Sequence, residues 1–228
     1  VNVSDGSTTK GEDTYVCTDV WPYVVVGNTA ITGGTDNSTF QLKTNPETYS
    51  YDYNVSTNGS LVSPGSTTGL AGDVDLAWSS PGVYEVRVNG QFPHQEYSNY
   101  SAVTDSAKIV DVANWGYIQW KNMSYMFQQS NRLESFSATD RPKTGEVTSM
   151  NSMFWEAPSF SDNLTSWNTS SVQVMAYMFG GYDADMSFEG DISGWDTSNV
   201  TDMTSMFQKA RNFTGDLSGW DTSSVEYM

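Results

Sequence analysis

Acidic side chains crowd one short stretch of the sequence, and their spacing suggests metal chemistry. The stretch "GGYDADMSFEGD" carries four carboxylates at Asp183, Asp185, Glu189 and Asp191. Hard cations such as Ca²⁺ are held by several oxygen ligands at close spacing, which this stretch could supply. The spacing matches no defined calcium loop, and a solvated acidic loop is the alternative interpretation. The sequence therefore leaves two expectations for cofactors, either none or a calcium ion at this loop.

Catalytic residue types are scarce. His94 is the only histidine and Cys17 the only cysteine. These counts exclude an intramolecular disulfide, a cysteine-based zinc site and a site with several histidines. His94 lies in "GQFPHQEY" without a nucleophile motif beside it, so we expect a solvated loop histidine. The carboxylates are spread through repeated turns, and we predict that the chain is not an enzyme.

Methionine recurs in one pattern. "NVTDMTSMF" (199–207) is echoed by "NMSYMF", "SMNSMF" and "VMAYMF", and the first methionines of the five copies are spaced by 27, 25, 28 and 25 residues. A fixed period of this length predicts stacked repeats, each too small to bury its own apolar face. We number them repeat 1 (111–137), repeat 2 (138–162), repeat 3 (163–190), repeat 4 (191–215) and repeat 5 (216–228). Repeat 2 is degenerate, with Pro142 in the place of a tryptophan.

Within a repeat, the apolar spacing predicts a short helix. Val200, Met203, Met206 and Ala210 follow helical spacing, Ser198 or Asn199 would cap that helix, and 192–195 would form a short strand or extended edge. The predicted repeat core is Trp115, Trp167, Trp195, Trp220, Met123, Met126, Met150, Met153, Met175, Met178, Met203 and Met206. A soft-metal role for the methionines and a sugar-binding platform of tryptophans are the alternatives.

The first half of the chain has a different pattern. Residues 1–22 are polar and resemble an arm or linker. Residues 23–106 contain short segments that alternate apolar and polar residues, such as "VYEVRVNG" (83–90), and predict strands with one buried face. "SPGSTTG" (63–69) and "SSPG" (79–82) predict turns. The expected fold is a β-sandwich followed by an α/β solenoid over 107–228, leucine-rich-repeat-like, with about 25 residues per coil.

The repeat wording resembles that of BspA-like leucine-rich-repeat surface proteins, W-[DN]-T-S-x-V-x-x-M-x-x-M-F. "WDTSNVTDMTSMFQKARNFTGDLSGWDTS" (195–223) matches it closely, and the resemblance covers about 107–228. "SSPGVYEVRVNGQFP" (79–93) resembles the last hairpin of a domain of the polycystic-kidney-disease (PKD) type, although the usual Gly-Asp-Gly turn is replaced by "STNGSLVSPGSTTG". The resemblance implies a non-enzymatic, secreted or cell-surface protein used in adhesion or in binding of proteins or glycans. A structural subunit of an extracellular filament, sheath or particle shell is the alternative, and an accessory module of a glycan-active enzyme is a third.

Charge and sequons bear on location and partners. Ten Lys and Arg face 27 Asp and Glu, a formal charge of −17, which argues against nucleic acid or an anionic membrane as partner. No segment has the apolar run of a membrane helix, so we expect no membrane insertion in this segment. Ten Asn-x-Ser/Thr sequons fit an exported glycoprotein, and the candidate acceptors outside the repeats are Asn37, Asn54, Asn58 and Asn99.

The two ends of the sequence raise the question of assembly. The sequence begins at Val1, without a signal peptide, which is compatible with a processed product or a fragment. Repeat 5 stops at Met228, after the first methionine of its pattern. A stacked repeat needs a covered end, so we expect either further repeats or another subunit there. The expected partners are thus an extracellular or matrix protein, a glycan, or copies of the chain itself.

Overall fold

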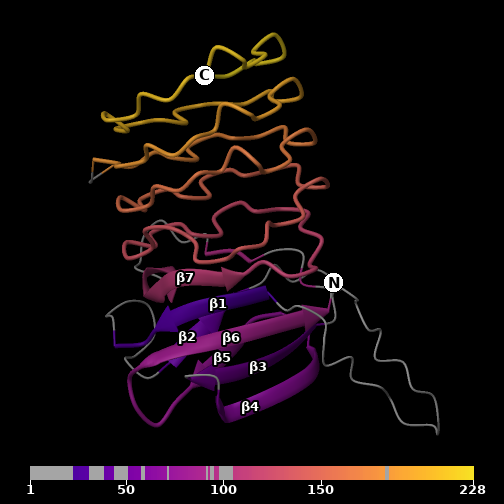
Figure 1. The fold of residues 1–228 in the computed structure, drawn as a ribbon, viewed down its shortest axis with the longest axis vertical. Coiled ribbons are helices and arrows are strands. Elements are labelled where there is room, and N and C mark those ends of the chain that lie inside the picture. The colour runs from indigo at the N-terminus through magenta and orange to yellow at the C-terminus, as the bar shows by residue number, and fades with distance from the viewer. Residues whose placement is uncertain are drawn as a thin grey trace, which may run out of the picture.

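The computed structural model describes residues 23–30, 39–43, 51–57, 60–70, 72–90, 92, 95–97, 105–182 and 185–228. A five-stranded antiparallel sheet has the strand order β4-β3-β6-β1-β7, and a two-stranded antiparallel sheet pairs β2 with β5 (Figure 1). The strands are β1 (Tyr23–Asn28), β2 (Thr39–Leu42), β3 (Tyr51–Thr57), β4 (Ser60–Leu70), β5 (Val74–Ala77), β6 (Val83–Gly90) and β7 (Ile109–Asn114). The only helix among these residues is the 3₁₀ helix η1 (Asp105–Lys108).

Alternating side chains build the core between the two sheets. In β6, Tyr84, Val86 and Val88 are buried while the residues between them are not, as the alternation in the sequence predicts. They join one apolar cluster with residues of the two-stranded sheet, including Phe40. A Cβ atom on Gly27 of β1 would lie 3.3 Å from the Phe40 ring, so the absence of a side chain lets the sheets approach closely here.

One predicted turn lies within a strand. The turn predicted at 63–69 is wrong, because these residues belong to β4. The ladder with β3 shifts register between the pairs Asn54↔Ser66 and Ser56↔Leu61, so 62–65 bulge from the ladder and include Pro64 and Gly65. Edge strands and bulges are where a sheet tolerates proline.

The predicted β-sandwich followed by an α/β solenoid is wrong. The protein is nearly all-β, its regular secondary structure is two small antiparallel sheets and η1, and the repeats contain no α-helix among the described residues. Repeats 1 to 5 are instead irregular, turn-rich layers that continue from β7 toward the C-terminus (Figure 1). Isolated parallel bridges join successive layers, for example Val174↔Asp202 and Asp202↔Tyr227.

The backbone explains why the helical spacing misleads. An α-helix needs each N–H to reach the carbonyl four residues back. Here Met206 N donates to Met203 O, only three residues back, while Met175 N donates to Asp202 O of the next repeat. Ser205 (φ 50°) and Lys209 (φ 61°) lie in the left-handed region, which an α-helix does not contain. The predicted cap at Ser198 or Asn199 is also wrong, because no helix follows it. Residues 192–195 do not form a strand, because 193–194 form a turn.

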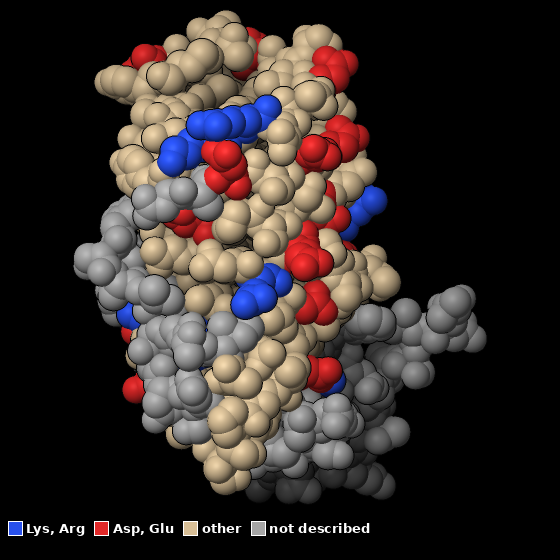
Figure 2. Space-filling model, turned by 90° about the vertical axis from the view of Figure 1, so that its left-hand side faces the viewer, with Lys and Arg blue, Asp and Glu red and all other residues tan. Residues whose placement is uncertain are grey.

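The apolar face of the repeats still forms one continuous core. Of the twelve predicted core side chains, only Trp220 is half-buried, and the others are buried. Two columns of phenylalanine rings run through the stack. In one of them the ring centroids of Phe154 and Phe179 are 5.6 Å apart, and the angle between the ring planes is 4°. Outside this core, Asp and Glu side chains lie scattered along the repeats (Figure 2).

Candidate functional site

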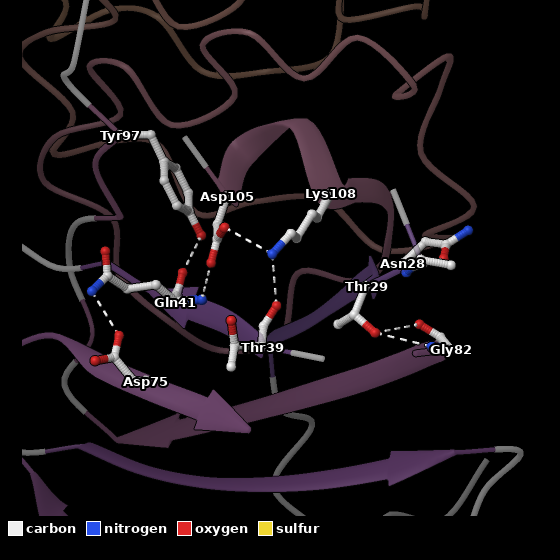
Figure 3. Close-up of polar contacts among 10 residues, drawn as sticks. Asn28, Thr29, Thr39, Gln41, Asp75, Gly82, Tyr97, Asp105 and Lys108 are labelled. Atoms are coloured by element: carbon white, nitrogen blue, oxygen red, sulfur yellow. Dashed lines mark hydrogen bonds and ion pairs between the residues drawn. The ribbon is translucent and has the colours of Figure 1, made fainter. Parts of the chain in front are cut away.

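A buried polar cluster joins η1 to β2 (Figure 3). Lys108 and Asp105 form an ion pair of 3.0 Å between Nζ and Oδ1, and their side chains are 0% and 2% exposed. Lys108 Nζ also donates to the Thr39 carbonyl (2.8 Å), and Asp105 Oδ2 accepts the backbone N–H of Gln41. The Tyr97 hydroxyl donates to the Gln41 carbonyl (3.0 Å).

These contacts assign the cluster a structural role. Each charged or phenolic group reaches a backbone atom of β2, so the cluster fixes that strand against η1. Burial, together with the negative charge of Asp105, raises the pKa of the Tyr97 phenol, which keeps it a neutral donor. The sequence offers no signal for this cluster, because its partners are 56 to 69 residues apart.

The predicted calcium residues are engaged separately. Asp185 lies 3.4 Å from the Arg211 guanidinium, and Asp191 accepts bonds from the N–H and hydroxyl of Ser193. At Glu189 the contact is made by the backbone, whose N–H donates to the Ser161 hydroxyl at 3.0 Å. Asp183 lies outside the described residues. In the described part of the chain, no group of three or more His, Cys, Asp or Glu side chains is placed to hold a metal.

The candidate glycan acceptors fall mostly outside the described structure. Asn37, Asn58 and Asn99 lie in undescribed segments, as does His94. The backbone of Asn54 lies in β3, paired with Ser66 of β4 and Arg87 of β6. These sites remain predictions.

The buried tryptophans pack against one another and do not offer a flat surface to sugars. Trp195 is 3% exposed and stacks on Trp220, with ring centroids 6.3 Å apart and an angle of 7° between the ring planes. Its indole N–H donates to the Leu164 carbonyl at 2.8 Å. Trp220 repeats this bond with the Ile192 carbonyl at 3.2 Å. Each indole thus ties its repeat to the one before it. The methionines are buried among Phe and Val side chains of the same core.

A polar groove of about 310 Å³ opens beside repeat 2, which has Pro142 in place of the repeated tryptophan. Trp115 and Trp167 contact each other directly across that repeat, with centroids 5.4 Å apart. The carboxylates that line the groove already bind backbone: Asp140 accepts the N–H groups of Trp115 (2.9 Å) and Gly116 (2.7 Å), and Asp162 accepts that of Phe136. The carboxylates that line this groove are therefore already used in holding the backbone.

An apolar groove of about 370 Å³ lies at the other end of the stack, and we call it the C-terminal face. Its walls come from repeats 4 and 5 and consist of Met203, Met206, Phe207, Leu217, Trp220 and Met228, with Ser205, Gln208 and Thr222 at its edge. Trp220 and Phe207 are half-buried, and Met228 is 81% exposed. Apolar side chains of the repeat core are accessible to solvent at this groove.

Short polar turns fix the outer edge of each repeat. Asp196 accepts the N–H and hydroxyl of Ser198, and Asn168 accepts the same two groups of Ser170 one repeat earlier. These are Asx turns, in which a side-chain oxygen binds the backbone two residues on. Hydrogen bonds from the serine two residues further on lower the pKa of Asp191, Asp196, Asp216 and Asp221, because these bonds favour the ionised carboxylate.

These features define a class: a β-rich protein in which two small antiparallel sheets continue into stacked, turn-rich repeats. A family model described as "Mycoplasma protein of unknown function, DUF285" matches residues 121–228, a stretch within the repeats. No curated protein and no solved structure matches the chain. Across the residues that the structure describes, no helix is long and apolar enough to cross a membrane.

Proposed function

We propose that the chain is a non-enzymatic module of an extracellular, cell-surface protein, similar to the BspA-like surface proteins, that serves in adhesion by binding a protein or glycan. The observation that carries this proposal is the use of the repeated residues. Trp, Met and Phe fill a continuous core, and the repeated Asp and Asn side chains hold turns. The repeated residues thus serve to build a fold that presents an extended surface.

Several features favour a protein partner over a glycan. Three of the four repeated tryptophans that would form a sugar platform are buried, with Trp115, Trp167 and Trp195 at most 6% exposed. Protein partners are instead bound through extended lateral surfaces in many repeat proteins. The formal charge of −17 also disfavours nucleic acid and anionic membranes as partners.

The experiment is surface labelling of intact native cells combined with competition. An antibody raised against the chain is expected to stain unpermeabilised cells, and soluble 1–228 is expected to inhibit their adhesion to protein-coated surfaces. Staining that appears only after permeabilisation, or adhesion unaffected by saturating 1–228, would overturn the proposal.

A structural subunit of an extracellular filament, sheath or particle shell is the alternative. The uniform way in which successive repeats bind one another, as in Met175 N to the Asp202 carbonyl and Met203 N to the Tyr227 carbonyl, favours it, because stacking of like units is how extended assemblies grow. Electron microscopy of native material distinguishes the two functions: regular filaments support the structural subunit, and isolated projections on the cell surface support the adhesion module.

A further inference from the structure

The polar groove beside repeat 2 contains a buried donor that has no acceptor among the described residues. Trp167 lines this groove and is 6% exposed. The equivalent indole N–H groups of Trp195 and Trp220 donate to carbonyls, whereas that of Trp167 does not. The indole nitrogen of Trp120 is unpaired and fully enclosed, but the one of Trp167 is not enclosed. The N–H of Trp167 is therefore open to the groove.

The ring of Trp167 is turned away from the bond that its equivalents make. The acceptor of the next indole is Leu164, three residues before Trp167, and the residue at the same place in repeat 2 is Thr139. Trp167 does not donate to it, and its ring packs against Trp115 and Phe136, with centroids 5.4 and 6.2 Å away. A buried donor without a bond costs ~1–3 kcal/mol. An oxygen atom placed in the groove would remove this cost.

Carboxylate acceptors line the same groove and are held in place by the backbone. A carboxylate offers about four lone-pair sites. Asp162 uses two of them, for the N–H groups of Phe136 at 3.0 Å and Asn163 at 2.7 Å. About two sites therefore remain for a ligand. Asp140 is fixed in the same way by two backbone N–H groups. The groove thus presents positioned acceptors beside the indole donor.

This combination of groups selects the chemistry of the ligand. Arg141 and Ser166 also line the groove, and both are exposed. An anion would meet the carboxylates of Asp140 and Asp162, and a cation would offer no acceptor to the indole and guanidinium donors. Hydroxyl groups both donate and accept. A sugar ring can therefore donate to the carboxylates while another of its oxygens accepts the N–H of Trp167.

The size and surroundings of the groove favour such a small ligand over a peptide strand. Its volume of about 310 Å³ is at the lower end of the range for small-molecule sites. An extended peptide binds by adding a strand to the edge of a sheet. Residues 136–141 and 162–167, which surround the groove, contain no strand. Phe136 is half-buried in the lining and supplies apolar surface for the C–H groups of a sugar.

We propose that the polar groove beside repeat 2 binds an uncharged sugar ring, such as the terminal hexose of a glycan. The contact uses the edge of the Trp167 indole and the carboxylates of Asp140 and Asp162, and the buried ring faces of the repeated tryptophans take no part in it. The inference goes beyond the proposed function, because a sugar in this groove is compatible with a protein partner on the lateral surface of the repeats and does not depend on the location of the chain.

The test is an NMR titration of the isotope-labelled 1–228 chain with glucose, galactose, mannose and N-acetylglucosamine. Trp167→Phe removes the N–H and keeps an aromatic ring, so the signal lost in this variant identifies the Trp167 indole. At least one of the sugars should shift this signal saturably at concentrations up to ~10 mM, the range of weak binding. The indole signal of Trp195, whose N–H is already bonded, should stay in place. Glucuronic acid and the peptide Gly-Arg-Gly, an anion and a cation, should bind about tenfold more weakly.

Two matched pairs of variants locate the contact, with affinity measured from the sugar signals by saturation-transfer NMR. Ser166→Arg places a long side chain in the groove and should weaken sugar binding about tenfold or more. Ser187→Arg, at an exposed position of the same repeat outside the groove, should bind as the original chain does. Both serines are exposed, so both variants are expected to fold normally. Trp167→Phe should also weaken binding about tenfold, whereas Trp195→Phe should not. Because only Trp195 loses a bond within the protein, Trp167→Phe should lower the urea midpoint less.

Three results would overturn the inference. The first is a Trp167 indole signal that none of the four sugars shifts at concentrations up to ~10 mM. The second is sugar binding that Ser166→Arg leaves unchanged. The third is tighter binding of Gly-Arg-Gly than of any sugar, which would assign the groove to a basic side chain of a partner protein. None of these bears on surface staining, so failure here is distinguishable from failure of the proposed function.

Discussion

Truncation of Trp195 tests whether the indole column holds the repeats together. Trp195→Ala removes a ring that is 3% exposed. On the order of 150 Å² of buried ring surface is lost, worth ~4 kcal/mol at ~25 cal/mol per Å². The Leu164 carbonyl also loses its indole donor at 2.8 Å, and an unpaired buried acceptor costs ~1 kcal/mol or more. We therefore expect a loss of ~4–5 kcal/mol in the free energy of unfolding.

Trp220 is the matched control within the same column. It makes the same type of indole bond, to Ile192 at 3.2 Å, but is half-buried at the C-terminal face. Because less ring area is buried at Trp220, Trp220→Ala should cost less than Trp195→Ala, ~3 kcal/mol. Trp195→Phe keeps most of the ring but loses the bond, and should also cost less than Trp195→Ala.

Urea unfolding followed by circular dichroism measures these differences, with the midpoint and slope fitted separately for each variant. The reasoning is refuted if Trp195→Ala costs less than ~1 kcal/mol, or no more than Trp220→Ala, because large aromatic truncations in a packed core cost ~3–5 kcal/mol. An exposed platform of tryptophans would then be the better interpretation.

Three further perturbations test other contacts. Gly180→Ala would place Cβ 2.6 Å from the Trp155 ring and should cost ~1–3 kcal/mol in thermal or urea unfolding, whereas Gly219→Ala, with 3.7 Å to its nearest atom, should cost less. Lys108→Met leaves the buried Asp105 carboxylate without its ion-pair partner and should cost ~3–5 kcal/mol, part of which the double variant with Asp105→Leu should restore; no recovery would contradict the ion-pair account. Because the folded-state pKa values of the Asx-turn aspartates are lowered, their contribution is complete above the unfolded pKa, near 4, and is lost as pH falls through the folded values. An acid titration should therefore show a smaller loss of stability at low pH in the variant with Asn at 191, 196, 216 and 221, and an unchanged loss would refute this cause.

The period of the repeats could be predicted from the sequence, but their backbone could not. The recurrence of Met203 and its equivalents identifies which side chains are buried, because every layer must present the same apolar face to its neighbours. The spacing of three and four residues is shared by a helix and by a pair of successive turns. What separates them is the left-handed conformation of Ser205 and Lys209, and neither residue is a glycine that would signal it.

The same limit applies to the candidate site. The Asx turns at the edges of the repeats could be expected from the recurring Asp and Asn residues. The bonds that join one repeat to the next, such as Met175 N to Asp202 O, could not be predicted, because local sequence does not encode them. In the first half, alternation predicts β6, whereas Lys108 gives no sign that it will be buried, because its carbonyl partner lies 69 residues away.

The Asx turns change what the sequons in the repeats imply. Asn122, Asn163 and Asn168 each belong to an Asn-x-Ser/Thr sequence, and each accepts the N–H two residues on. One and two repeats after Asn168, Asp196 and Asp221 make the same bond. The sequence [Asp/Asn]-x-[Ser/Thr] is therefore favoured by the turn, since Asx side chains and small hydroxyl residues stabilise it. Sequons inside the repeats would recur in such a fold whether or not the protein meets a glycosylation enzyme. The argument for export thus depends on the sequons outside the repeats, and mass analysis of native glycopeptides containing Asn37, Asn54, Asn58 and Asn99 decides it: occupancy there supports export, and four bare sites would remove this support.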